Sequence, residues 1–217
     1  KFKVEHNVVT TQIEPHDWIA ETCHALIRVN NIVNDLNNDM WMYIANDIFI
    51  LKTIKDEVGS STMPHKVNPI DFENSEGNIG LANSMLNFFA EKLPISRLQR
   101  DLSDSTTLRN IGVAFGYSVI SYKSTLKGLQ KITPNKNKIN EELDNNWIVL
   151  SEAVQTIMRL ENIENAYEKL KDLTRGKNLN KEQYLEFVEN LDVTQKNKDY
   201  LKSLNPRNYI GVAPKLK

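Results

Sequence analysis

The residues best suited to chemistry lie in one break between apolar stretches, residues 59–69, which read Gly-Ser-Ser-Thr-Met-Pro-His-Lys-Val-Asn-Pro. Lys66 and Asn68 offer donors to an anion, and Ser60 or Ser61 can act as nucleophile or base only if its hydroxyl is activated. No carboxylate or histidine is placed locally to orient a catalytic triad. A serine base would therefore need backbone N–H groups and cations to stabilise its alkoxide. Taken alone, the composition of this segment favours a plain turn between helices.

A second segment, residues 97–110, is also rich in groups that bind anions. Its hydroxyls and free backbone N–H groups at an expected helix start suit phosphate. Arg109 falls one turn into that helix, where a guanidinium can hold phosphate or carboxylate with two hydrogen bonds. A capped helix with surface arginines fits this segment equally well. Further upstream, His16 beside Asp17 does not have metal-ligand spacing, and Asp17 fits a helix cap as well as a site.

The elements that must position these residues are predicted to be long helices. Apolar residues recur at steps of three and four from Pro15 to about Val58, which predicts one helix with Pro15 at its first position. Further helices are predicted over about 71–92 and 106–130, the latter capped within 103–105. Helices of this length need a bundle to bury their apolar stripes. Gly112 and Gly116, four residues apart, predict that a neighbouring helix approaches closely there.

After residues 133–135 the predicted helices are shorter, at about 135–144, 146–161, 164–174, 180–191 and 195–203. Gly176 fits a helix C-cap, and Asn180 with Gln183 fits a capping box. No strand-like alternation of useful length is present. The sequence therefore predicts an all-α fold, with a long-helix bundle over 1–131 and a smaller helical domain over 132–217.

Bulk composition narrows the function class. The 217 residues carry a net charge of −1, which gives no basic field for nucleic acid. No apolar run approaches the roughly 20 residues that span a bilayer, and no signal peptide opens the chain. The one cysteine, Cys23, is interpreted as a core residue and fits a reducing compartment. These features predict a cytoplasmic protein, and the non-Met start together with the unpartnered long helices suggests a piece of a longer chain.

Residues 59–69 resemble the signature Gly-Ser-Ser-x-Met-Pro-x-Lys-x-Asn-Pro of the fumarase/aspartase superfamily, and every fixed position matches. His65, at a variable position, is similar to adenylosuccinate lyases, whereas argininosuccinate lyases usually carry Gln there and fumarases Gly. The segments 70–78, 99–106 and 167–176 resemble the bacterial-type adenylosuccinate lyase branch. The similarity extends from Thr11 to about Gly211.

This resemblance implies a homotetramer built on long helices, with each active site assembled from three subunits. It implies β-elimination of fumarate from adenylosuccinate, giving AMP, and from the succinylated aminoimidazole carboxamide ribotide earlier in purine synthesis. No metal or organic cofactor is implied. A base-bearing loop is also expected to move as it closes over substrate and opens for product.

The resemblance also implies roles for individual residues. Ser60 is the catalytic base that removes the β-proton of the succinyl group, while Lys66 and Asn68 bind the succinyl carboxylates and stabilise the aci-carboxylate. Arg100 and the segment 105–109 hold the phosphate and a nearby carboxylate. The expected substrate-binding residues are Gln12, Ser61, Lys66, Val67, Asn68, Asn74, Arg100, Ser105, Thr106, Thr107, Leu108 and Arg109.

One departure from the family pattern concerns the general acid, a histidine in the N-terminal half of these enzymes. None of the four histidines here, His6, His16, His24 and His65, lies in a Thr-Ser-His-type motif. We therefore expect a C-terminal half whose N-terminal domain is absent and which is inactive in isolation.

Two alternatives stay open. Another lyase of the superfamily, such as argininosuccinate lyase, is disfavoured by His65 and by the phosphate segment 105–109. A non-catalytic helical assembly module is disfavoured by the retention of Ser60, Lys66 and Asn68.

Overall fold

The computed structural model describes residues 6–52, 68–165, 168, 170–171 and 179–216. The chain divides into two compact units, Lys1–Pro134 and Asn135–Lys217. Each unit is described by itself below.

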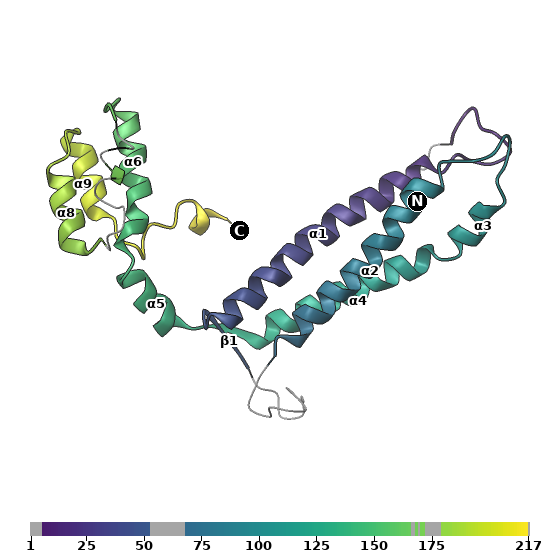
Figure 1. The fold of residues 1–217 in the computed structure, drawn as a ribbon, viewed down its shortest axis with the longest axis horizontal. Helices are drawn as coiled ribbons and strands as arrows, with labels where there is room; N and C mark the ends of the chain where they lie inside the picture. The colour runs from purple at the N-terminus through teal and green to yellow at the C-terminus, as the bar shows by residue number, and fades with distance from the viewer. Residues whose placement is uncertain (1–5, 53–67, 166–167, 169, 172–178, 217) are drawn as a thin grey trace. The chain divides into compact units, whose positions relative to one another are not determined.

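The first unit is a bundle of three long helices that pack side by side (Figure 1): α1 (Asp17–Ala45), α2 (Ile70–Lys92) and α4 (Ile111–Lys131). A short helix, α3 (Ser103–Leu108), precedes α4. The predicted helical bundle is confirmed, and α2 agrees with its predicted bounds to within one residue. None of the helices in the described part of the chain is long and apolar enough to cross a membrane.

The prediction that the first helix continues to Val58 is wrong, because α1 ends at Ala45. Asp47 then takes a left-handed backbone conformation, with φ of 59°. Strand β1 (Phe49–Leu51) follows and pairs antiparallel with β2 (Ile132–Pro134). Apolar residues continue to recur at steps of three and four past Ala45, because β1 is itself a run of aromatic and aliphatic residues. Such residues suit a strand as well as a helix. The prediction of no strands was therefore also wrong.

The third predicted helix is interrupted rather than continuous. Arg109 and Asn110 separate α3 from α4, and Arg109 is the C-cap of α3 instead of a residue one turn into a long helix. The proposed side-chain caps within 103–105 do not form. Instead, the carboxylate of Asp101 accepts a hydrogen bond from the backbone N–H of Ser103 at 2.9 Å. Likewise Asp17 is not a cap, since the N-cap of α1 is His16.

The end of the bundle near α3 has an apolar core. Its buried residues come from α1, α2 and α4, and Cys23 is fully buried among them, which confirms its interpretation as a core residue. The members of this core are Ile19, Ala20, Cys23, Ala82, Leu86, Phe89, Ala90, Leu93 and Ala114.

Further along α1 the buried face turns polar. Asn30 and Asn37 follow Cys23 at a spacing of seven residues and are as buried as Cys23. The Asn30 amide donates to Asn83 Oδ1 at 2.8 Å and to Ser118 Oγ at 3.2 Å. Asn37 belongs to a second group, in which its amide donates to Ser75 Oγ at 2.9 Å and its Oδ1 accepts from Thr125 Oγ1 at 2.8 Å. Both buried amides are thus satisfied across all three helices.

The close helix approach occurs at a glycine other than the two predicted. A Cβ atom at Gly128 would lie 2.8 Å from the ring of Phe72, so any other residue at this position of α4 would force the Phe72 ring of α2 to shift. At Gly112 and Gly116 an added Cβ meets no atom of the described chain within 4 Å. The prediction for those two positions was wrong within this chain.

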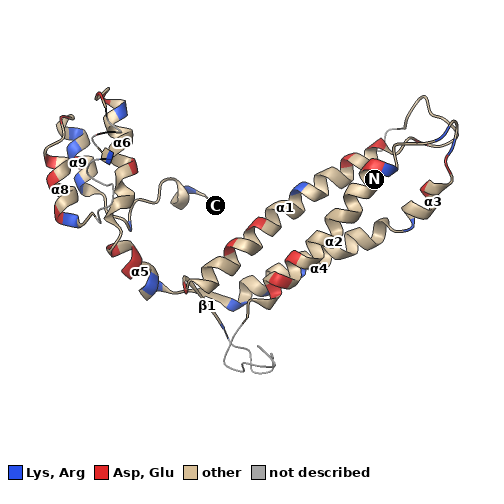
Figure 2. Cartoon of the chain, viewed as in Figure 1, with Lys and Arg blue, Asp and Glu red and all other residues tan. Residues whose placement is uncertain are grey.

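The second unit is smaller and helical. It contains α5 (Lys136–Asp144), η1 (Trp147–Leu150), α6 (Ser151–Leu160), α8 (Lys181–Glu189), α9 (Gln195–Ser203) and η2 (Ala213–Lys215). Tyr184 is buried in its core, where the hydroxyl donates to the carbonyl of Leu201 at 2.8 Å. The capping box of Asn180 and Gln183 is confirmed. Gly176 and much of the predicted helix 164–174 lie outside the described residues. Acidic and basic positions are interspersed along the helices (Figure 2).

Candidate functional site

The sequence-predicted site residues that the structure describes fall into two groups. The loop-end group, Asn68 and Asn74, lies where α2 begins. The α3-end group comprises Gln12, Arg100 and residues 105–109, at the opposite end of α2. Four predicted residues lie outside the described part of the chain: Ser60, Ser61, Lys66 and Val67. The movement expected of their loop therefore stays a prediction.

In the loop-end group, Asn74 is exposed on the first turns of α2 but is oriented by a neighbouring helix. Its amide donates to Ser124 Oγ of α4 at 3.0 Å. Its Oδ1 accepts from the amide of Asn78 at 3.2 Å. The side chain is therefore held from two directions while remaining accessible. Asn68 is half-buried, two residues before α2 begins.

The α3-end group depends on two segments that are far apart in the sequence. The backbone N–H of Gln12 donates to the carbonyl of Gln99 at 3.3 Å, which places residues 11–16 beside the segment that leads into α3. The side chains of Gln12, Arg100, Thr106 and Arg109 are exposed. The structure thus brings the predicted amide and both predicted arginines to one end of the bundle.

The remaining predicted residues of α3 differ in their availability. Ser105 and Leu108 are half-buried. Thr107 is buried, and its hydroxyl donates to the carbonyl of Ser103 at 3.1 Å, within its own helix. The hydroxyl of Thr107 is therefore occupied by a backbone bond.

Glu14 organises the turn that carries Gln12. Its Oε2 accepts from the backbone N–H of His16 at 2.9 Å and from Trp18 Nε1 at 2.8 Å, and it lies 2.8 Å from His16 Nδ1. Desolvation opposes ionisation of Glu14, but the hydrogen bonds from His16 and Trp18 outweigh it and lower the pKa of this carboxyl. His16 has φ of 63°, a left-handed conformation that costs free energy for a residue with a side chain. The Glu14 bonds stabilise this turn.

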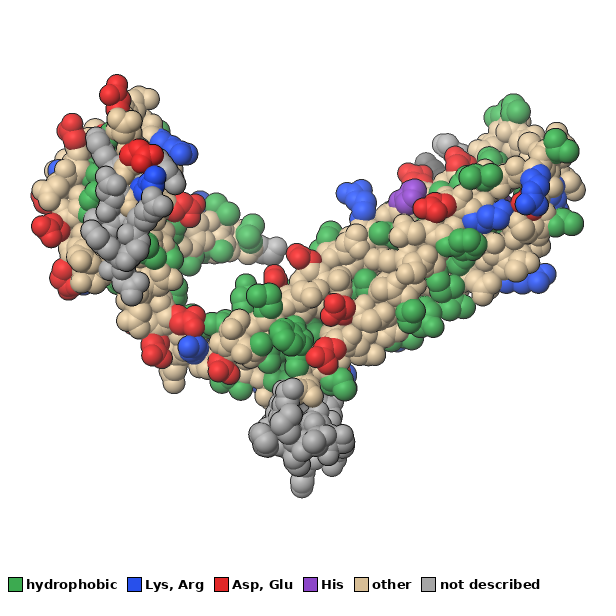
Figure 3. Space-filling view, viewed as in Figure 1, with side chains coloured by type: hydrophobic (Ala, Val, Ile, Leu, Met, Phe, Trp, Pro, Cys, Tyr) green, Lys and Arg blue, Asp and Glu red, His purple; other side chains and the backbone are tan. Residues whose placement is uncertain are grey.

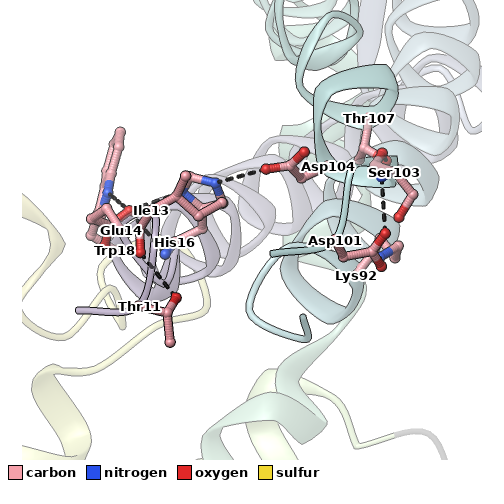
Figure 4. Close-up of polar contacts among 10 residues, drawn as sticks. All are labelled: Thr11, Ile13, Glu14, His16, Trp18, Lys92, Asp101, Ser103, Asp104 and Thr107. Atoms are coloured by element: carbon pink, nitrogen blue, oxygen red, sulfur yellow. Dashed lines mark hydrogen bonds and ion pairs between the residues drawn. The ribbon is translucent and has the colours of Figure 1, made fainter. Parts of the chain in front are cut away.

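The His16 ring faces a second carboxylate across the gap between the two segments (Figure 4). Its Nε2 lies 3.8 Å from Asp104 Oδ2 of α3. Asp104 is buried, and neither its Oδ1 nor the nearby Ser103 Oγ has a hydrogen-bond partner among the described residues. Sequence analysis did not identify this pair, because no local pattern links two residues so far apart in the chain.

Asp101 anchors the start of α3. Its buried carboxylate accepts from the Ser103 N–H, and Lys92 Nζ lies 3.1 Å and Arg97 Nη1 3.5 Å from it. The hydrogen bond from the Ser103 backbone N–H, together with that from Lys92, holds the pKa of Asp101 far below its usual range. Among the described residues no cluster of three or more His, Cys, Asp or Glu has the geometry to hold a metal ion.

This lowered pKa predicts a pH-dependent effect of Asp101→Asn. A carboxyl whose pKa falls on folding stabilises the fold fully above its unfolded pKa, near 4, and loses that contribution as pH falls towards the folded pKa. We expect Asp101→Asn to lower the unfolding temperature equally at pH 7 and about pH 5, and by progressively less as pH falls below about 4 towards the folded pKa. Thermal unfolding of variant and parent across this range measures the difference. Asp35→Asn, on the exposed face of α1, is the matched control, and a pH-independent gap for Asp101→Asn contradicts the prediction.

The two groups of site residues are separated by most of the length of α2. At about 1.5 Å per residue, the stretch from Asn74 to Lys92 is roughly 27 Å long, and Lys92 contacts Asp101 beside α3. A small-molecule substrate does not reach from one group to the other. The predicted residues that the structure describes therefore do not form one continuous site within a single chain.

Comparison with known proteins identifies the family. Residues 96–210 match the family described as adenylosuccinate lyase C-terminal, and residues 1–82 match the family described as lyase. The chain is 56% identical over 210 residues to adenylosuccinate lyase of Buchnera aphidicola (subspecies Schizaphis graminum), with 97% of this chain and 46% of that protein covered. It is 55% identical over 210 residues to adenylosuccinate lyase of Escherichia coli K12, with the same coverage. The chain thus spans about half the length of the curated relatives it matches.

A solved structure supports the fold at a greater distance. The crystal structure of class II fumarase from Schistosoma mansoni matches with a TM-score of 0.58 at 17% identity, covering 88% of this chain and 37% of that one. This likeness confirms the superfamily's long-helix fold. The family match over residues 96–210 shows that the chain belongs to the adenylosuccinate lyase family.

Proposed function

We propose that the complete protein containing this chain eliminates fumarate from adenylosuccinate to give AMP, and from the succinylated aminoimidazole carboxamide ribotide. The observation that carries the proposal is the exposed pair Arg100 and Arg109 at the α3 end. Neither guanidinium forms an ion pair with any residue that the structure describes. Together with the half-buried Ser105 they supply donors for a phosphate or carboxylate.

The reaction breaks one C–H bond and one C–N bond of the succinyl group. Ser60 takes the β-proton, and Lys66 and Asn68 stabilise the negative charge that develops on the adjacent carboxylate. The electron pair of the C–N bond then leaves with the amine, which a general acid protonates. None of the histidines in this chain has the family's acid context, so that proton comes from outside it. No metal or organic cofactor takes part in this proposal.

We further propose that the protein assembles as a homotetramer in which the loop-end group of one subunit faces the α3-end group of another. The separation of roughly 27 Å along α2 supports this, since a small substrate needs both groups. Large apolar side chains are exposed along α1, α2 and α4, as the green side chains on the bundle in Figure 3 show in part. They include Ile32, Leu81, Phe88, Val119, Ile120 and Leu126.

Burying such a surface between subunits is favourable, and Phe88 also borders a pocket of about 400 Å³ beside Thr106 and Thr107. A cytoplasmic location, where purine nucleotides are made, accords with the single cysteine.

The test is a substrate panel with the complete protein. We expect fumarate release from adenylosuccinate and from the succinylated ribotide, and none from argininosuccinate. Preference for argininosuccinate would assign the protein to another branch of the superfamily. Tight binding of adenylosuccinate without fumarate release would instead support a non-catalytic assembly module.

A further inference from the structure

Lys131, the last residue of α4, is bonded to both ends of the stretch that carries the signature segment. Its carbonyl accepts a hydrogen bond from the backbone N–H of Lys52 at 2.8 Å. Its ammonium forms an ion pair with the carboxylate of Asp71. Both partners of the ion pair are buried, with Lys131 6% and Asp71 8% exposed. One residue therefore holds the chain where the segment leaves β1 and where it enters α2.

The first end is fixed by backbone pairing. Lys52 directly follows β1, in which Leu51 is the register partner of Ile132 and Ile50 that of Thr133. The Lys52 bond to Lys131 extends this pairing by one residue towards the signature segment. The position of Lys52, the last described residue before the signature segment, is thus set by the antiparallel register.

The second end is fixed by several contacts to the last two turns of α4. Lys127 Nζ also lies 3.2 Å from the other oxygen of the Asp71 carboxylate, but its side chain is 57% exposed and this pair adds little to the anchoring. The backbone carbonyl of Asp71 accepts from Ser124 Oγ at 2.8 Å. The ring of Phe72 lies against Gly128. The first turn of α2 therefore cannot shift along α4 without breaking directional bonds.

We propose that Lys131 is a positioning residue for the elimination, acting through Asp71 and Lys52 on the segment between them. Asp71 lies three residues after Asn68, so a displacement of Asp71 shifts the described end of the signature segment. The inference rests on the proposed function, because it assigns the segment its role in proton abstraction. It goes beyond that function, since Lys131 itself contacts no substrate.

The burial of this ion pair supports a role beyond stability. Taking two charges out of water costs free energy that their attraction repays only with good geometry, and an apolar pair of similar volume is often as stable. An apolar pair lacks the direction of an ammonium–carboxylate bond. The charged pair therefore contributes a defined geometry at the base of the signature segment.

The kinetic test compares two lysines that meet the same carboxylate. In the complete protein we expect Lys131→Met to lower kcat by about tenfold or more while KM changes by less than about threefold, because small misplacement of reacting groups costs rate rather than binding. Lys127→Met removes the exposed partner and should leave kcat within about twofold. Equal effects of the two substitutions would overturn the proposal.

A double variant separates positioning from stability. Asp71→Leu combined with Lys131→Met removes both buried charges, so its unfolding temperature should recover relative to Lys131→Met. Its kcat should stay reduced. Recovery of kcat together with stability would show that the pair is merely structural.

Hydrogen exchange gives a readout independent of turnover. In Lys131→Met, backbone amides of residues 53–69 should exchange at least about threefold faster than in the parent, while those of α1 should not change. Unchanged exchange rates of residues 53–69 would contradict this inference, whatever the activity of the variant. Absence of fumarate release from the parent protein would sink the proposed function separately.

Discussion

Replacing Ser60 by Ala in the complete protein is expected to lower kcat for fumarate release from adenylosuccinate by about a thousandfold. The substitution removes only the hydroxyl oxygen, which in the proposed reaction takes the β-proton. The residual rate should come from binding and from stabilisation of the developing charge by Lys66 and Asn68. KM should change little, since the hydroxyl acts on a bond that breaks only in the transition state. Steady-state release of fumarate measures both parameters.

The control for this prediction lies two residues further along the same segment. Thr62 occupies a variable position of the signature, so Thr62→Ala should retain activity within about threefold. The thermal unfolding temperature of both variants should match that of the parent. Near-normal turnover of Ser60→Ala would remove the base assignment, and an equal loss in Thr62→Ala would attribute the effect to the segment's conformation.

Mixed oligomers are expected to recover activity that neither parent variant has. Arg109→Ala removes a donor from the α3-end group, and Ser60→Ala removes the proposed base, eight residues before Asn68 of the loop-end group in the sequence. Because roughly 27 Å of α2 separates the two groups, each complete site should draw them from different subunits. Coexpression of the two variants should then create some sites in which both groups are native.

The expected size of this recovery follows from random assembly. A site has an even chance of receiving a native loop-end group and an even chance of receiving a native α3-end group, which gives about one quarter of wild-type activity. If one chain supplied both groups to the same site, mixing would restore nothing. Coexpression of Ser60→Ala with a second variant of the loop-end group, Asn68→Ala, is the matched control and should give no native site.

Local sequence patterns predicted much of the fold. The apolar period located α2, and the shorter helices at α5, α8 and α9 matched their predicted bounds within about two residues. The capping box at Asn180 formed because its two hydrogen bonds lie within one turn of chain. Such features depend on residues close together in sequence, and local patterns therefore capture them.

Features that depend on distant partners were missed. The end of α1 is set by pairing of β1 with β2, about eighty residues downstream, which no periodicity within α1 reveals. The approach of His16 to Asp104 was missed for the same reason. The burial of Asn30 and Asn37 was not predicted either, because only Asn83, Ser118 and the other partners on α2 and α4 make it favourable.

The roles of the site residues remain predictions of the resemblance. The structure shows that Gln12, Arg100 and Arg109 are exposed at one end of the bundle and that Asn74 is exposed near the other. The distance between these two positions could not be predicted from the sequence, because the site motifs do not tell how the helices that carry them are arranged.

The two buried asparagines of α1 have a consequence for the reaction centre. Sliding one helix past another by a single turn, about 5.4 Å, would leave the amides of Asn30 and Asn37 without partners in an interior where unsatisfied polar groups are costly. Apolar side chains in their place would tolerate such a slip far better. The axial register of the bundle, and with it the distance between the loop-end group and the α3-end group, is thus set by two amides that belong to neither group. Asn30 and Asn37 thereby fix the distance between the two groups of site residues.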